Sequence, residues 1–300
     1  MKKGEKMNND LVLIGHISRD IVIDHLNQET KIVGGAVIYA ASAIAQSGLN
    51  LTVISKLPKS EESLKKDLMS EKARWVIKNS QSMTSIRNHY LTADKERRDV
   101  VLLSKADSFT LSDIEDEESP IYYLAGLFVG EIPDTLIKPL ALKGKVAIDA
   151  QGVLRESDEN GNMLSRDWGN KKQLIPYITY LKVDAAEAQV LTGFSDNEKA
   201  IRQLGKWGAK EVMLTHNSQV MVLSGDKIYF APYTNKNNSG RTGRGDTTFS
   251  SYLAWRKEHS IEEAIQYAAT LCSIKMEKPG VFKGSPQDVI DRINRDKISE

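Results

Sequence analysis

The residues best suited to chemistry lie in one glycine-rich stretch, Asn-Ser-Gly-Arg-Thr-Gly-Arg-Gly-Asp-Thr-Thr-Phe, at positions 238–249. Backbone N–H groups around Gly243 and Gly245 are not obstructed by side chains, and with the positive end of a following helix they suit an anion such as phosphate. A carboxylate is a poor neighbour for phosphate unless it accepts a proton, so we interpret Asp246 as the base for a nucleophile that attacks the phosphate. The stretch therefore predicts phosphoryl transfer.

A simpler explanation of this stretch stays open, because glycine-rich turns with an aspartate before a helix often only cap that helix. The stretch also lacks the spacing of a P-loop and the Gly-x-Gly-x-x-Gly pattern of a dinucleotide-binding fold. A phosphate site here would therefore belong to a different kind of loop.

The composition excludes several classes of function. The 41 Lys and Arg residues nearly balance the 40 Asp and Glu residues, which gives no support for a nucleic-acid or membrane partner. The five histidines lack metal-ligand spacing, and the single cysteine, Cys272, lies in an apolar helical pattern typical of a core residue. A zinc or thiol mechanism is therefore not expected.

The first ten residues are polar and charged, without the apolar segment of a signal peptide, and no stretch reaches the roughly 18 apolar residues of a membrane span. We therefore expect a cytoplasmic protein in which residues 1–10 form a disordered tail. At 300 residues the chain is long enough to bury a full core.

Short apolar runs alternate with helical patterns, which indicates an α/β fold with a mostly parallel sheet. The expected strands are 11–14, 121–124, 146–148, 178–183 and 212–214, followed by an edge hairpin of 220–223 and 227–230. An alanine-rich helix follows Gly34-Gly35 and is predicted to end at Gly48, and further helices are expected over 247–257, 261–272 and 286–295. The region 52–107 predicts a small sheet, with strands near His89 and Val100.

Three motifs in this order resemble the PfkB carbohydrate kinase family, also called the ribokinase-like family, from about Leu11 to Arg295. They are a Gly-x-x-x-x-Asp that ends at Asp20, Gly-Gly-Ala-Val-Ile-Tyr-Ala-Ala at 34–41, and Thr-Gly-Arg-Gly-Asp-Thr at 242–247. The resemblance implies one ribokinase-like three-layer α/β/α domain over 11–295. Its small β-sheet lid would be built from about 16–33 and 84–104 and is often shared in a homodimer.

The resemblance also implies ATP and Mg²⁺ as co-substrate and metal. Asp246 would be the base, and the loop made of Thr242, Gly243, Arg244 and Gly245 would hold the transferring phosphoryl group. Phosphoryl transfer relies on positioning and charge stabilisation, so the family's roles agree with the interpretation of the residues themselves. Further nucleotide contacts would come from the positions of Thr215, His216, Pro279 and Gly280.

On the acceptor side, Asp20 matches the family's residue that binds acceptor hydroxyls, and Gly34 and Gly35 match the turn on which the acceptor lies. Asp20 could equally be a turn residue. Asp149, at the carboxyl end of a central strand, either lines the site or caps a turn. From the lid, His89 and Arg87 are candidate contacts; for Arg97 and Arg98 a solvated charged ribbon is the favoured interpretation.

Glu187 matches the Glu of the family's Asn-x-x-Glu element and would organise Mg²⁺, with Asp184 in place of the Asn. The two carboxylates could instead only favour a helix dipole. Two more departures are Arg244, at a position that is usually small, and His216-Asn217, where many relatives have a glycine that contacts the nucleotide. At these positions the chain departs from the family's pattern for holding ATP and the metal.

The sequence therefore predicts an ATP- and Mg²⁺-dependent kinase that phosphorylates a hydroxyl of a small sugar, polyol or cyclitol by direct in-line transfer, with Asp246 as base. Two alternatives remain. One is a catalytically idle relative that binds a sugar or nucleotide as a sensor or assembly partner, and the other is a nucleoside kinase of the same fold, which the lack of an aromatic sandwich in the lid disfavours.

Overall fold

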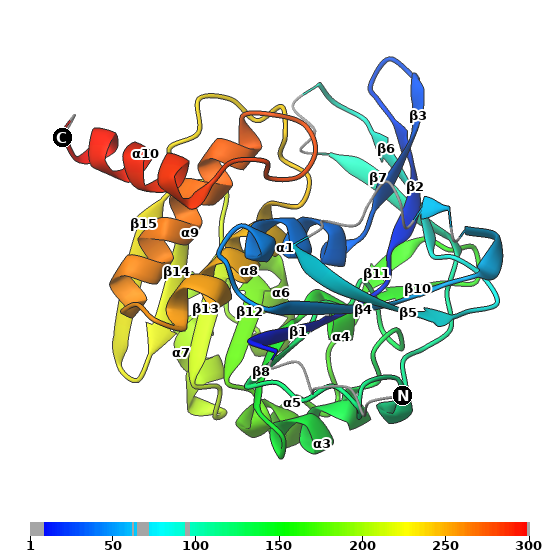
Figure 1. Cartoon of the computed structure of the whole chain (residues 1–300), viewed down its shortest axis with the longest axis horizontal. Coiled ribbons are helices and arrows are strands. Elements are labelled where there is room, and N and C mark those ends of the chain that lie inside the picture. Colours follow the sequence, from blue (N-terminus) through cyan, green and yellow to red (C-terminus); the bar gives the residue numbers. More distant parts are fainter. Residues whose placement is uncertain (1–8, 62, 65–71, 94–96, 299–300) are drawn as a thin grey trace, which may run out of the picture.

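The computed structural model describes residues 9–61, 63–64, 72–93 and 97–298. Its main sheet has the strand order β15-β14-β13-β12-β9-β8-β1-β4-β5 (Figure 1). Strand β14 pairs antiparallel with β13 and β15, and all other neighbouring strands pair in parallel. The strands are β1 (Leu11–Ile14), β4 (Leu51–Leu57), β5 (Ala73–Asn79), β8 (Ile121–Leu124), β9 (Lys145–Asp149), β12 (Tyr180–Asp184), β13 (Glu211–Thr215), β14 (Gln219–Ser224) and β15 (Lys227–Pro232).

Helices cover both faces of this sheet and make the fold a three-layer α/β/α sandwich. Strand β1 reads Leu-Val-Leu-Ile and is buried on both sides, as expected for a central parallel strand. One face packs against α1 (Ala36–Ala45), α8 (Arg244–Arg256) and α9 (Ile261–Met276), with α10 (Pro286–Ile298) beyond them. The other face packs against α3 (Ile137–Ala141), α5 (Lys171–Leu174), α6 (Ala185–Thr192) and α7 (Asn197–Lys206). The predicted fold class is confirmed.

A separate four-stranded sheet forms the predicted lid, in the order β3-β2-β6-β7, and projects from one side of the main body (Figure 1). Its strands are β2 (Ser18–Ile23), β3 (Glu29–Gly34), β6 (Ser85–Tyr90) and β7 (Arg98–Ser104). A short turn, α4 (Gln151–Leu154), leads into a hairpin of β10 (Arg155–Ser157) and β11 (Met163–Ser165), which touches the lid at the Val101–Asn162 bridge. A homodimer through this lid stays a prediction.

Buried polar groups fix the place where the lid leaves the main sheet. The backbone N–H of His16 donates to Glu131 Oε1 at 2.7 Å, and that of Leu127 donates to Glu131 Oε2 at 2.8 Å. The His16 Nδ1 lies 3.0 Å from the hydroxyl of Thr84, which starts the second lid segment. Since buried polar groups need such partners, both lid segments are held to the end of β1.

Two boundaries differ from the sequence-based expectations. Helix α1 ends at Ala45 with Gln46 as its C-cap, and two turn residues separate the helix from Gly48, which has φ of 82°. Residues 1–8 of the expected tail lie outside the described residues, but Asn9 and Asp10 belong to the folded body. Asn9 is buried and accepts a hydrogen bond from Thr52 Oγ1 at 2.7 Å. Within the described residues, no helix combines the length and apolarity that a membrane crossing requires.

Candidate active site

The glycine-rich stretch runs directly into the 13-residue helix α8, which begins at Arg244. Gly243 precedes it in the left-handed region, with φ of 78°. A Cβ on Gly243 would lie 2.3 Å from the ring of Tyr39 in α1, so this position excludes a side chain both by conformation and by contact. The loop is therefore pressed onto α1, which fixes the direction in which its N–H groups point.

The first turn of α8 leaves backbone donors for an anion. The N–H of Arg244 is bonded to Arg241 O at 3.2 Å, and that of Thr247 to Gly243 O at 2.9 Å. Helix geometry leaves the N–H groups of Gly245 and Asp246 without an intrahelical acceptor, at the positive end of the helix dipole. This is the arrangement that the sequence predicted for a phosphate.

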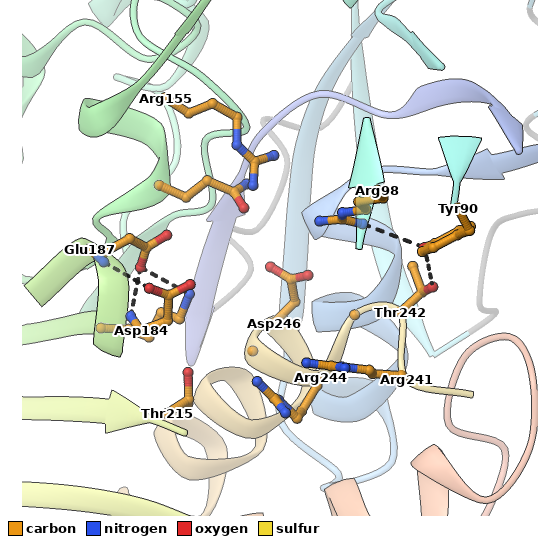
Figure 2. Close-up of a pocket in the computed structure, with 14 residues that line it drawn as sticks. Tyr90, Arg98, Arg155, Asp184, Glu187, Thr215, Arg241, Thr242, Arg244 and Asp246 are labelled. Atoms are coloured by element: carbon orange, nitrogen blue, oxygen red, sulfur yellow. Dashed lines mark hydrogen bonds and ion pairs between the residues drawn. The ribbon is translucent and has the colours of Figure 1, made fainter. Parts of the chain in front are cut away.

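A cavity of about 280 Å³ opens in front of this helix end (Figure 2). Five cationic and three acidic side chains line it, and Asp246 lies between the Asp184–Glu187 pair on one side and lid residues on the other. The lining residues are Tyr90, Arg98, Gln151, Arg155, Lys182, Asp184, Glu187, Thr215, Arg241, Thr242, Gly243, Arg244, Gly245 and Asp246. The cavity thus joins the lid, the loop and the carboxyl ends of the central strands.

A buried lysine supports the floor of the cavity. Lys182 Nζ lies 3.1 Å and 3.0 Å from the two carboxylate oxygens of Asp149, and 3.5 Å from Glu187 Oε2. Burial alone would lower the pKa of Lys182, but Asp149 and Glu187 raise it above its ordinary value. A Cβ on Gly245 would lie 3.2 Å from Lys182 Cε and Nζ, so the lysine charge sits directly against the anion loop.

Asp184 and Glu187 form a capping box at the start of α6. The Asp184 N–H donates to Glu187 Oε2 at 2.7 Å, and the Glu187 N–H donates to Asp184 Oδ1 at 2.8 Å. This explains the helix start, while both side chains also line the cavity. The described residues contain no ready-made cluster of three or more metal-ligating side chains. Mg²⁺ typically uses one or two carboxylates with waters and substrate phosphates, so this pair fits that ion.

Two carboxyls in the cavity have raised pKa values. Burial and the negative charge of Asp149 raise the pKa of Asp246 to about 6. The positive charges of Lys182, Arg155 and Lys275 oppose this shift. Burial likewise raises the pKa of Glu187 to about 7, although Lys182 opposes it. A base is most effective when its pKa lies near the working pH, so Asp246 is suited to accept a hydroxyl proton.

This electrostatic arrangement predicts an acidic limb in the rate. Asp246 must be ionised to accept a proton, so kcat/KM is expected to fall about tenfold per pH unit below pH 6 and to level off above about pH 7.5. The measurement is kcat/KM against pH for the wild type and for Glu187→Gln. A limb that persists in the variant belongs to Asp246 or to Asp20, because burial raises the pKa of both to about 6. A profile flat from pH 5 to 8 would contradict the assignment.

The predicted acceptor residues meet beside the cavity. Gly35 has φ of 99°, and a Cβ there would lie 2.4 Å from His16 O, so the turn into α1 requires glycine. A Cβ on Gly34 would lie 2.8 Å from Asp20 Oδ2. Burial raises the pKa of Asp20 to about 6, and Asp20 Oδ1 is buried without a hydrogen-bond partner among the described residues. Such an acceptor oxygen is suited to a substrate hydroxyl.

Besides the acceptor residues Asp20, Gly34 and Gly35, five predicted residues do not line this cavity. Asp149 is buried beneath it, where Lys182 and the N–H of Gln151 at 3.0 Å occupy its carboxylate. His89 points to the other face of the lid and lines a second cavity with Arg87 and Asn162, because side chains alternate along β6. His216, Pro279 and Gly280 are exposed on turns outside the cavity lining.

The structure adds residues to which no role was assigned from the sequence. Arg155, Arg241 and Lys182 line the cavity, and Tyr90 reaches from the lid, its hydroxyl 3.3 Å from Thr242 Oγ1. Arg98, for which a solvated ribbon was favoured, is exposed, and it also lines the cavity. One signal was available for Lys182, since a lysine inside the apolar strand Tyr-Leu-Lys-Val-Asp needs a buried partner.

Comparison with known proteins identifies the family of this chain. The model of the family described as pfkB family carbohydrate kinase matches residues 1–288. A cytidine kinase of Thermococcus kodakarensis is 25% identical over 268 residues, which cover 86% of this chain and 92% of that protein.

Two solved structures show the likeness in three dimensions. A sulfate complex of a pyrophosphate-dependent kinase in the ribokinase family has a TM-score of 0.87 at 33% identity, covering 94% of this chain and 99% of that one. A pyrophosphate-dependent kinase in the ribokinase family, complexed with a pyrophosphate analog and myo-inositol, has a TM-score of 0.86 at 33% identity and the same coverage. The chain therefore belongs to the pfkB family of carbohydrate kinases and is a phosphotransferase with an alcohol group as acceptor.

Proposed function

We propose that this kinase phosphorylates a hydroxyl of a cyclitol or a similar small polyol or sugar, and that its phosphoryl donor is pyrophosphate. The donor differs from the ATP that the sequence predicted. The observation that carries the proposal is the cavity around Asp246, which combines five cationic side chains with a wall that lacks aliphatic side chains among the described residues.

The charge in the cavity suits a short, highly charged donor. Burial and the nearby charge of Arg98 lower the pKa of Arg155, and the charges of Glu187, Asp149 and Asp246 oppose this shift, so the two guanidinium groups repel one another. A diphosphate placed between them would relieve that repulsion and accept several charge-assisted hydrogen bonds. An adenine ring instead needs apolar surface, which this lining does not offer.

Two more arginines are held at the mouth of the loop. Arg241 and Arg244 both donate to Asn217 Oδ1, at 3.1 Å and 3.2 Å. Asn217 lies in the turn after β13, where the sequence departs from the nucleotide-binding pattern of many relatives. The departure thus places two guanidinium groups beside the anion loop, which supports a donor recognised through its phosphates.

The proposed reaction uses the residues already described. The acceptor hydroxyl, oriented by Asp20, attacks the terminal phosphorus in line with the bridging oxygen and loses its proton to Asp246. The bond from that phosphorus to the bridging oxygen breaks, and the remaining phosphate leaves. The N–H groups of Gly245 and Asp246 and the charge of Lys182 stabilise the transferring group. Mg²⁺ held near Asp184 and Glu187 would neutralise donor charge.

The donor is tested by comparing kcat/KM for magnesium pyrophosphate and MgATP with one accepted acceptor. We expect kcat/KM to be at least about two orders of magnitude higher with pyrophosphate than with ATP. A loss of this size is typical when the poorer substrate leaves buried charged groups of the site without partners. An Asn217→Gly variant serves as the matched probe, because it releases both arginines from their shared acceptor. A preference of the wild type for ATP would contradict the proposed donor and leave the kinase assignment intact.

A nucleoside acceptor is the second candidate, and the similarity to a cytidine kinase favours it. The cavity offers one aromatic side chain, Tyr90, among the described lining residues, so a base would stack on one side at most. Cytidine therefore belongs in the acceptor panel beside inositols and sugars.

A further inference from the structure

One buried charge takes no part in the reaction as described so far. Lys275 lies in the last turn of α9 and is 3% exposed. The rest of that helix face is apolar core, with Ala268, Leu271 and Cys272 all buried. A lysine is rarely buried this deeply without a partner that uses its charge.

The partners of Lys275 are two carbonyls of the anion loop. Its ammonium donates hydrogen bonds to Gly240 O and Thr242 O, both within the stretch that leads into α8. Its Nζ also lies 4.8 Å from the centre of the Tyr39 ring, the ring that packs against Gly243. One side chain thus connects α9, α1 and the loop, and it is not among the residues that line the cavity.

The packing of Gly240 leaves the loop little room to move relative to α9. Its N–H donates to Met276 O at 2.8 Å. A Cβ on Gly240 would lie 1.8 Å from Lys278 O and 2.7 Å from Lys275 O, so the backbone itself rests on the helix end. The carbonyls of Gly240 and Thr242 therefore face Lys275, while Gly245 and Asp246, which follow them, line the cavity.

We propose that Lys275 is a positioning residue for the donor site, whose ammonium holds the carbonyls of Gly240 and Thr242 and so keeps the N–H groups of Gly245 and Asp246 aimed at the donor phosphate. This inference rests on the proposed function of the loop. Lys275 lies outside the cavity but would affect donor affinity in two ways. It holds the geometry of the loop, and it places a positive charge behind the loop.

The charge of Lys275 is sensitive to pH. Burial lowers its pKa to about 8, while Cys272 and Asp246 oppose that shift. The groups that face it do not titrate between pH 7 and 9.5: burial raises the pKa of Cys272 to about 11 and that of Tyr39 above its ordinary value, and Asp246 is already ionised. Above pH 8 the neutral amine keeps weaker hydrogen bonds and loses its charge. The KM for the donor is therefore expected to rise between pH 7 and 9.5.

The test measures the affinity for pyrophosphate by calorimetry, and the donor KM and kcat, for Lys275→Met and for the exposed control Lys283→Met. We expect Lys275→Met to weaken donor binding about tenfold or more and to abolish the alkaline rise in donor KM. The control should match the wild type. The melting temperature of Lys275→Met should fall little, because a pKa lowered on folding means that the fold disfavours the charged lysine.

Chemical rescue separates positioning from a general loss of packing. In Lys275→Ala, methylammonium should restore part of the donor affinity by occupying the vacated space with an N–H cation. Tetramethylammonium at equal ionic strength should not, because it has no N–H groups. If neither variant folds, the alkaline rise in donor KM of the wild type still tests the inference.

The outcomes for the two proposals are distinguishable. Wild-type turnover with unchanged donor affinity in Lys275→Met, or a wild-type donor KM that is flat to pH 9.5, would overturn the role of Lys275 alone. Binding of pyrophosphate without turnover would overturn the proposed reaction. The pyrophosphate affinities of the wild type and Lys275→Met would then still decide the role of Lys275. A wild type that binds no phosphate donor would overturn both.

Discussion

Replacing Asp246 by Asn is expected to lower kcat by at least about two orders of magnitude, the usual contribution of a positioned general base. The amide keeps the size of the side chain but cannot accept the proton of the acceptor hydroxyl. Donor affinity should change little, because the N–H groups of Gly245 and residue 246 and the charge of Lys182 remain. Steady-state kinetics with a saturating acceptor and donor measures this.

The stability of the same variant provides the control. Because burial raises the pKa of Asp246 from 3.8 to about 6, its ionised form is less favourable in the folded protein than in the unfolded chain. The resulting stability is present below pH 3.8 and lost as the pH rises through 6, so the charge is a cost at pH 7.5. Asp246→Asn should therefore melt at the same temperature or higher. Full activity in the variant would show that another group takes the proton.

Replacing Lys182 by Met is expected to lower the free energy of unfolding by about 3–5 kcal/mol, the scale observed when one partner of a buried ion pair is removed. The variant leaves the carboxylates of Asp149 and Glu187 buried without their cation. At pH 5 the loss should shrink, because Glu187, whose pKa burial raises to about 7, is then protonated and needs no cation. Denaturant unfolding at pH 7.5 and pH 5 measures both values, with Lys283→Met as the control for losing a lysine.

A double variant shows whether the pairing itself is responsible. Asp149→Asn removes one of the stranded charges, so Lys182→Met combined with Asp149→Asn should be more stable at pH 7.5 than Lys182→Met alone. The non-additive part of the double-mutant cycle gives the coupling between the two side chains. Strictly additive losses would mean that Lys182 acts through packing and not through this pair.

The sequence predicted the loop and both sheets because their signals are local. Alternating apolar runs, the hairpin turn at Gly225-Asp226 and the glycines of the loop each act within a few residues, and β14 and β15 pair as expected. The capping box at Asp184 and Glu187 is equally local. The structure contains this capping box, and both side chains also line the cavity.

The remaining part of the site depends on contacts between distant segments. Lys275 meets Gly240 across 35 residues, and Arg155 reaches the cavity after a turn whose direction no periodicity encodes. The sequence indicates the lid strand that carries His89, which is why we expected this residue in the site. The face of the lid on which its side chain lies depends on the register of β6. A shift of one residue exchanges the two faces of a strand, and composition does not reveal it.

The most direct test of the account follows the phosphoryl group itself. Wild-type protein would be incubated with Mg²⁺, pyrophosphate or ATP, and each of a panel of inositols, sugars and cytidine, and the products read by ³¹P NMR. We expect a new phosphate monoester resonance with a cyclitol or similar polyol when pyrophosphate is the donor, and no such resonance with Asp246→Asn. No monoester with any pair of donor and acceptor, from protein that still binds the donor, would contradict it.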